Sequence, residues 1–151
     1  MKPTISVTEE ITMITLQNIS ADMNIIADIF EKIAQLGIDI DIISLSPVQS
    51  SKTSLTFTIK DEDLIRILEF TSSLSNGKIK TIVCSGNYII SIFAEEMENT
   101  PGIASKIFRA VADAHTDVRV ISTSEVQISI LVTSADFQDV NTAINNCVAN
   151  M

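Results

Sequence analysis

The sequence contains few of the residues that catalytic and metal sites commonly use. Its 151 residues include one histidine, two cysteines, four glycines and no tryptophan. Cys84 and Cys147 are far apart and form no CxxC pair, and no cysteine lies near His115 in the sequence, so the familiar metal and redox spacings are missing. The scattered glycines form no phosphate-binding loop. We therefore expect no cofactor and no catalysis by this chain alone.

Positive charge is also scarce. Lysine and arginine total 10 against 19 aspartates and glutamates, which gives a formal net charge of −9, and the basic residues do not cluster as a nucleic-acid-binding groove requires. No apolar run reaches the roughly 18 to 20 residues that cross a bilayer, and residues 1–8 lack the pattern of a signal peptide. These features predict a cytoplasmic protein without nucleic-acid or membrane partners.

The chain does contain an internal repeat. Residues 25–46 recur without a gap as residues 103–124, 78 positions later. Each copy begins with apolar residues at helical spacing and ends with an alternating apolar run, which predicts a helix followed by a strand. The identical pairs are Ile25/Ile103, Ile29/Ile107, Phe30/Phe108, Ala34/Ala112, Asp39/Asp117, Ile43/Ile121, Ser44/Ser122 and Ser46/Ser124. The repeat predicts two units of roughly 70 residues, and such small units are expected to pair within the chain or as a homodimer.

The hydrophobic pattern predicts the same series of elements in both units. In the first unit we expect a helix at 24–36 ended by Gly37, a helix at 61–74 capped by Asp61, and strands at 11–16, 38–46, 53–59 and 78–84. In the second unit we expect a helix at 102–114, a helix at 135–148 capped by Ser134, and strands at 88–94, 117–122 and 126–132.

This order predicts an α+β fold of two ferredoxin-like βαββαβ units in tandem, each an antiparallel sheet with its helices on one face. The second unit lacks a closing strand, which a short strand at residues 4–8 could supply. We therefore expect one unit at residues 10–85 and another at residues 86–151 completed by residues 4–8. A cleft between related units is a common place to hold a small ligand.

Acidic residues gather at two places in the sequence, one in an expected strand and one in a loop. Asp39 and Asp41 alternate along an expected strand, and Glu95, Glu96 and Glu98 share one loop. Such carboxylates form either a solvated acidic surface or a site for an ammonium group. The segment Thr100-Pro101-Gly102 precedes a helix, where backbone N–H groups and a bare glycine would receive a carboxylate. Carboxylates on one side and the start of a helix on the other would together bind the ammonium and carboxylate groups of an amino acid.

Two segments of the second unit carry a family resemblance. Residues 97–108 (MENTPGIASKIF) and 118–129 (VRVISTSEVQIS), with Ile121 to Glu125 as the most specific run, closely resemble the second ACT unit in the regulatory region of aspartate kinases. Residues 7–8, 19–20, 38–43 and 53–58 are similar to the paired first unit and its preceding strand, so that the resemblance extends over nearly the whole chain. In that family the first unit is inserted into the second.

The resemblance implies an allosteric sensor for lysine, threonine or a related amino acid, bound where ACT units meet and acting on an aspartate kinase domain or subunit. By matching position, the loops between strand and helix would contribute Asp22, Asn24, Ile25, Thr100, Gly102 and Ile103. The strands facing them would add Asp39, Ile40, Asp117, Val118 and Ser124. Where the first unit of the family commonly reads Asp-Lys-Pro-Gly, this chain has Ala21-Asp22-Met23-Asn24, and Leu45 stands at a common glutamine position. The alternative interpretation is therefore a structural dimerisation module whose ligand site has decayed.

Overall fold

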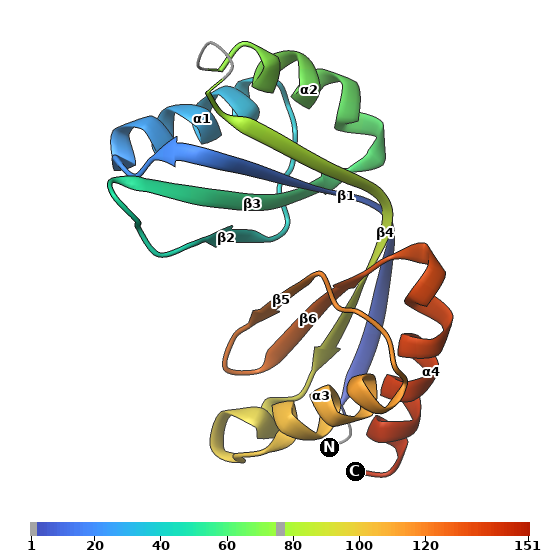
Figure 1. Cartoon of the computed structure of the whole chain (residues 1–151). Helices are drawn as coiled ribbons and strands as arrows, with labels where there is room; N and C mark the ends of the chain where they lie inside the picture. The colour runs from blue at the N-terminus through green and yellow to red at the C-terminus, as the bar shows by residue number, and fades with distance from the viewer. Residues whose placement is uncertain (1–2, 75–77) are drawn as a thin grey trace. The chain divides into compact units, whose positions relative to one another are not determined.

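The computed structural model describes residues 3–74 and 78–151. Its elements can be followed along the chain in Figure 1. The helices are α1 (Met23–Gln35), α2 (Leu64–Ser72), α3 (Ile103–Asp113) and α4 (Ser134–Ala149), with short 3-10 helices η1 (Asp61–Asp63) and η3 (Glu95–Asn99). The strands are β1 (Thr4–Ser20), β2 (Ile43–Leu45), β3 (Lys52–Lys60), β4 (Lys80–Phe93), β5 (Val120–Thr123) and β6 (Gln127–Val132).

The chain divides into two compact units. The first unit is Glu10–Ser85, and the second unit combines Met1–Glu9 with Gly86–Met151. The strand order is β2-β3-β1-β4 in the first unit and β1-β4-β6-β5 in the second, with antiparallel pairing of β2 and β1 to β3 and of β5 and β4 to β6. Both orders are those of a βαββαβ ferredoxin-like unit, which confirms the expected fold class.

Two strands are longer than the sequence pattern predicted. The expected strands at 4–8 and 11–16 form the single strand β1, and those at 78–84 and 88–94 form the single strand β4. Polar residues interrupt the apolar alternation at Glu9-Glu10 and at Ser85-Gly86-Asn87, where Glu10 and Gly86 adopt a positive φ of 59° and 72°, but each strand continues beyond the interruption. Each strand therefore contributes one part to each unit, and the N-terminal part of β1 completes the sheet of the second unit.

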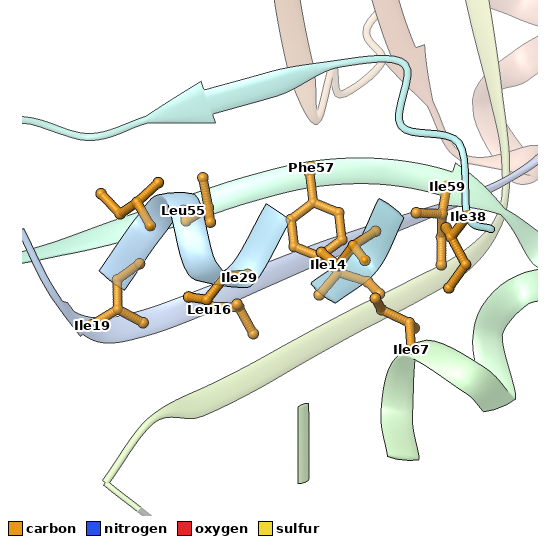
Figure 2. Packing of buried hydrophobic residues seen from close by; sticks show 11 residues of the cluster. Ile14, Leu16, Ile19, Ile29, Ile38, Leu55, Phe57, Ile59 and Ile67 are labelled. Atoms are coloured by element: carbon orange, nitrogen blue, oxygen red, sulfur yellow. The ribbon is translucent and has the colours of Figure 1, made fainter. Parts of the chain in front are cut away.

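The core of the first unit lies between its sheet and its two helices. Ile29 of α1 and Ile67 of α2 pack against Ile14 of β1 and Phe57 of β3, all nearly fully buried, as Figure 2 shows. The ring of Phe30 meets Phe57 edge-on with centroids 6.1 Å apart. Burial of these side chains at helical and alternating positions is the main stabilising force of the unit, at about 1.5–3 kcal/mol for each large aliphatic side chain.

The second unit has a separate core of the same construction. Its cluster consists of Ile107 and Val111 from α3, Val140, Ile144 and Val148 from α4, Ile90 and Ile92 from β4, and Ile128, Ile130 and Val132 from β6. Ile5 of β1 packs against this cluster, and Tyr88 stacks on Phe137 with ring centroids 3.9 Å apart. The N-terminal strand thus shares a core with residues 86–151.

The strands predicted after the first helix of each unit are shorter than expected. Strand 38–46 reduces to β2, and strand 117–122 reduces to β5. Ile38 and Ile42 are nevertheless buried, and the Asp41 N–H donates to the carbonyl of Thr58 at 3.2 Å. The alternation of isoleucine and aspartate therefore indicates a segment with one buried side. Only its C-terminal residues, Ile43–Leu45, form a strand of the sheet.

Two predicted helix caps are wrong, and one predicted helix end is confirmed. Asp61 begins η1 and accepts a hydrogen bond from the Thr12 hydroxyl at 2.6 Å, while α2 starts later without a side-chain cap. Ser134 is the first residue of α4, whose N-cap is Thr133, and neither helix end has a side-chain cap bond there. Gly37 follows α1 in the left-handed conformation with φ of 74°, as predicted. Within the described residues, no helix is both long enough and apolar enough to span a membrane.

Candidate functional site

The candidate site is built around the start of α3. Gly102 is the N-cap of this helix and has φ of 98°, a left-handed conformation that side-chain-bearing residues rarely adopt. Its carbonyl accepts hydrogen bonds from the Ser105 hydroxyl at 2.8 Å and from the Lys106 N–H at 3.1 Å. No side chain caps the helix, and the first N–H groups of any α-helix have no acceptor within it. The end of α3 is therefore electropositive and open to an anionic group.

A cavity of about 300 Å³ lies beside this helix end. Three segments of the second unit form its wall: the segment from η3 into α3, the turn between β5 and β6, and β6 itself. The lining residues are Met97, Glu98, Thr100, Pro101, Gly102, Ile103, Ala104, Thr123, Ser124, Glu125 and Ile128. Its volume is at the lower end of the range for small-molecule pockets, which is suitable for a single amino acid.

The turn between β5 and β6 contributes polar residues to the same cavity wall. The Ser124 N–H donates to the Gln127 carbonyl at 2.8 Å, and the Ser124 hydroxyl accepts from the Val126 N–H at 3.4 Å. Glu98 and Glu125 both line the cavity and are exposed. The described wall thus combines an electropositive helix end, two carboxylates and the hydroxyl-bearing residues Thr100, Thr123 and Ser124 with the apolar residue Ile128. This arrangement is complementary to a zwitterion with a small side chain.

Four of the residues singled out from the sequence meet at this cavity: Thr100, Gly102, Ile103 and Ser124. Two others from the second unit do not line it. Asp117 donates its N–H to the Asp136 carboxylate at 3.4 Å, and Val118 packs against the core.

Glu98, one of the loop carboxylates that the sequence offered for an ammonium group, also lines the cavity, whereas other lining residues were not among the expected contacts. Glu125 is the clearest case, because it lies within the most specific run of the sequence resemblance and next to Ser124 in a tight turn. Its place in that run could have suggested from the sequence that Glu125 lines the cavity.

The matching place in the first unit is constructed differently. Asp22 is the N-cap of α1, and its carboxylate accepts a hydrogen bond from the Asn24 N–H at 2.9 Å. The helix begins at Met23, so that Asn24 and Ile25 belong to its first turn. Asp39 is exposed in the segment before β2, and Ile40 packs against the core of the first unit.

A cavity of about 600 Å³ in the first unit contains Ser46, the counterpart of Ser124 in the repeat. Its lining residues are Asn18, Ser46, Pro47, Gln49, Ser50, Lys52, Thr53 and Ser54. None of the five residues predicted from the first unit is among them. The structure therefore brings four of the six predicted contacts of the second unit to one cavity, and none of the five from the first unit to the cavity that contains Ser46.

Known proteins match this chain in sequence and in fold. Residues 90–147 match the model of the ACT domain family. The chain is 30% identical over 124 residues to an aspartokinase of Geobacillus stearothermophilus, covering 82% of this chain and 30% of that protein. It thus spans about a third of the length of the curated aspartokinases it matches.

Solved structures agree with the sequence matches. The regulatory subunit of aspartate kinase from Thermus thermophilus, in its ligand-free form, superimposes with a TM-score of 0.85 at 25% identity, covering 95% of both chains. The aspartate kinase of Synechocystis superimposes with a TM-score of 0.89 at 25% identity, covering 96% of this chain and 26% of that one.

Proposed function

This chain is an ACT-domain protein that resembles the regulatory region of aspartate kinases, and from this premise we propose that it senses a free amino acid. It does so without catalysis of its own and passes the signal to an aspartate kinase domain or subunit. The observation that carries the proposal is the cavity of the second unit, whose wall contains the open end of α3 together with Glu98 and Glu125.

The ligand's two charged groups fit opposite sides of this cavity. Its α-carboxylate would accept hydrogen bonds from the N–H groups at the start of α3, where Ile103 and Ala104 line the wall. Its α-ammonium group would pair with Glu125 or Glu98, and the Ser124 hydroxyl would add a hydrogen bond. Lysine could use the second carboxylate for its side-chain ammonium, whereas threonine could bond a hydroxyl of the β5–β6 turn. These two amino acids are the preferred candidates.

Four of the remaining predicted contacts are assigned to the pairing with a second copy of an ACT unit. Asp39 and Ile40 precede the edge strand β2, and Asp117 and Val118 precede the edge strand β5. Both edge strands carry exposed apolar side chains, with Ile43 at 55% and Ile121 at 48% exposure. Exposed apolar residues at a sheet edge favour pairing with another chain. We therefore propose a homodimer whose pairing brings these segments toward ligand sites.

Regulation follows from differential binding. The ligand would bind one arrangement of the regulatory units more tightly and shift the population toward it. An affinity ratio of about 10- to 100-fold, equivalent to roughly 1.4 to 2.7 kcal/mol, gives useful control.

The proposal is tested by calorimetric titration of the full chain with lysine, threonine, methionine and isoleucine. At least one of them is expected to bind and to raise the melting temperature, because a ligand that binds only the folded state stabilises it by mass action. Absence of heat and of any thermal shift across the panel, in a protein that is still dimeric, would instead support the structural dimerisation module.

A further inference from the structure

We propose that Asp22 is a built-in substitute for the ligand carboxylate, so that the first unit is permanently occupied by its own side chain and the chain binds one amino acid, in the second unit. This inference rests on the proposed function. It goes further by stating how many ligand sites the chain has and which residue blocks the other one.

The two helix starts differ in what engages their N–H groups. At α1, the Asp22 carboxylate accepts from the Asn24 N–H at 2.9 Å. The Asp22 carbonyl accepts from the N–H groups of Ile25 and Ile26 at 3.0 and 3.2 Å. Two N–H groups of the first turn that an amino-acid carboxylate would use, those of Asn24 and Ile25, are therefore already bonded to atoms of Asp22.

At α3 the carbonyl of the N-cap residue Gly102 likewise accepts from a backbone N–H, that of Lys106 at 3.1 Å, but no side chain supplies an acceptor. The repeat aligns Asp22 with Thr100, Met23 with Pro101 and Asn24 with Gly102. Because Gly102 adopts a left-handed conformation, α3 begins at Ile103, which is the counterpart of Ile25, and no side chain caps it. The helix of the first unit is thus longer by Met23 and Asn24. These extra residues occupy the position at which the second unit has the wall of its cavity.

Competition at α1 strongly favours the side chain over a free ligand. A carboxylate attached to the residue before the helix is held at the donors at a high effective concentration, which a dissolved amino acid does not match. The Asp22 charge also repels a second carboxylate at the same helix end. The Asp22 carboxylate therefore already neutralises the positive end of the α1 dipole that a dissolved amino acid would need.

The first measurement is the stoichiometry of the full chain by calorimetry, with L-lysine as the probe and L-threonine if lysine gives no heat. One molecule per chain is expected. A value of two per chain overturns this inference and leaves the proposed function intact. Absence of binding by every amino acid of the panel overturns the proposed function instead.

The second measurement uses a variant in which the start of α1 carries the sequence found at the start of α3. Replacing Asp22-Met23-Asn24 by Thr-Pro-Gly (Asp22→Thr, Met23→Pro, Asn24→Gly) removes the carboxylate and opens the helix end. We expect a second binding step to appear. The matched control is Asp22→Asn, which keeps a capping side chain and should retain one site. A folded triple variant that still binds only one amino acid would overturn the inference.

If the triple variant does not fold, the backbone amide NMR spectrum of the Asp22→Asn variant still tests the contact between the Asp22 carboxylate and the Asn24 N–H. The Asn24 amide signal should shift on Asp22→Asn, whereas Asp28→Asn on the exposed side of α1 should leave it in place. An unmoved Asn24 signal would show that Asp22 does not occupy the helix end.

Discussion

His115 stands at the position where the repeat has Gly37. Both residues follow a helix in the left-handed conformation, with φ of 56° for His115 and 74° for Gly37. Glycine adopts this conformation without steric cost, whereas a residue with a Cβ does not. His115→Gly should therefore raise the free energy of unfolding by about 1 kcal/mol, and Gly37→Ala should lower it by about 1 kcal/mol. Urea denaturation of both variants measures the pair, and effects of equal sign would contradict this explanation.

Glu125 is expected to contribute to ligand affinity through its charge. Glu125→Gln keeps the shape of the side chain and removes an exposed carboxylate from the cavity wall. Because exposed charge pairs are worth up to about 1 kcal/mol, we expect the amino acid to bind about 2- to 5-fold more weakly. Glu62→Gln, which changes an exposed carboxylate of the first unit, is the control. Titration calorimetry compares the two, and equal affinities would remove Glu125 from the site.

At the scale of elements, Arg66 connects the two helices of the first unit. Its guanidinium donates to the carboxylate of Asp63 and to the carbonyl of Leu36, the C-cap residue of α1. The Asp63 side chain is only 8% exposed, so removing its partner leaves a buried charge without compensation.

Arg66→Met should therefore lower the free energy of unfolding by about 1–3 kcal/mol. The control is Arg109→Met on α3. Its ion pair with Asp113 spans 3.8 Å between side chains at least 70% exposed, and should contribute no more than about 0.5 kcal/mol. Thermal unfolding of both variants tests the contrast, which would fail if the two losses were similar.

The sequence predicted the type and order of the elements better than their ends. Helical spacing identified all four α-helices because a packed face requires that spacing whatever surrounds it. Pattern could not show that β1 and β4 continue through polar residues, since continuity of a strand depends on pairing with distant segments. It also could not reveal that Asp61 bonds to Thr12, a contact between residues far apart in the sequence.

The candidate site was predictable where local sequence defines it. Thr100, Gly102 and Ile103 form one short segment, and the glycine itself indicates the open helix end. Glu125 joins them only through the register of β5 with β6, which pairs Thr123 with Ile128. In the first unit, none of the contacts predicted by the same alignment lines the cavity that contains Ser46, and α1 starts two residues earlier than α3, where Met-Asn replaces Pro-Gly.

At the scale of the whole molecule, the N-terminal residues are expected to stabilise the second unit selectively. Residues 4–9 provide the β1 part of its sheet, and Ile5 packs against its core. Deleting residues 1–9 should lower the stability of the second unit by about 2 kcal/mol or more. Hydrogen exchange should then accelerate in α3 and α4 and remain unchanged in α1. Unaltered protection in α3 and α4 would show that this strand is dispensable.

The passage of β1 and β4 through both units also determines the sequence of events during synthesis. On the ribosome, residues 10–85 emerge complete and can fold while the nascent chain is still growing. Residues 4–9, made earlier, must wait for β4 to follow before they acquire a partner. This early-made strand segment is thus among the last parts of the two units to be placed, and a holding chaperone that covers it in the meantime would prevent premature pairing with a neighbouring nascent chain.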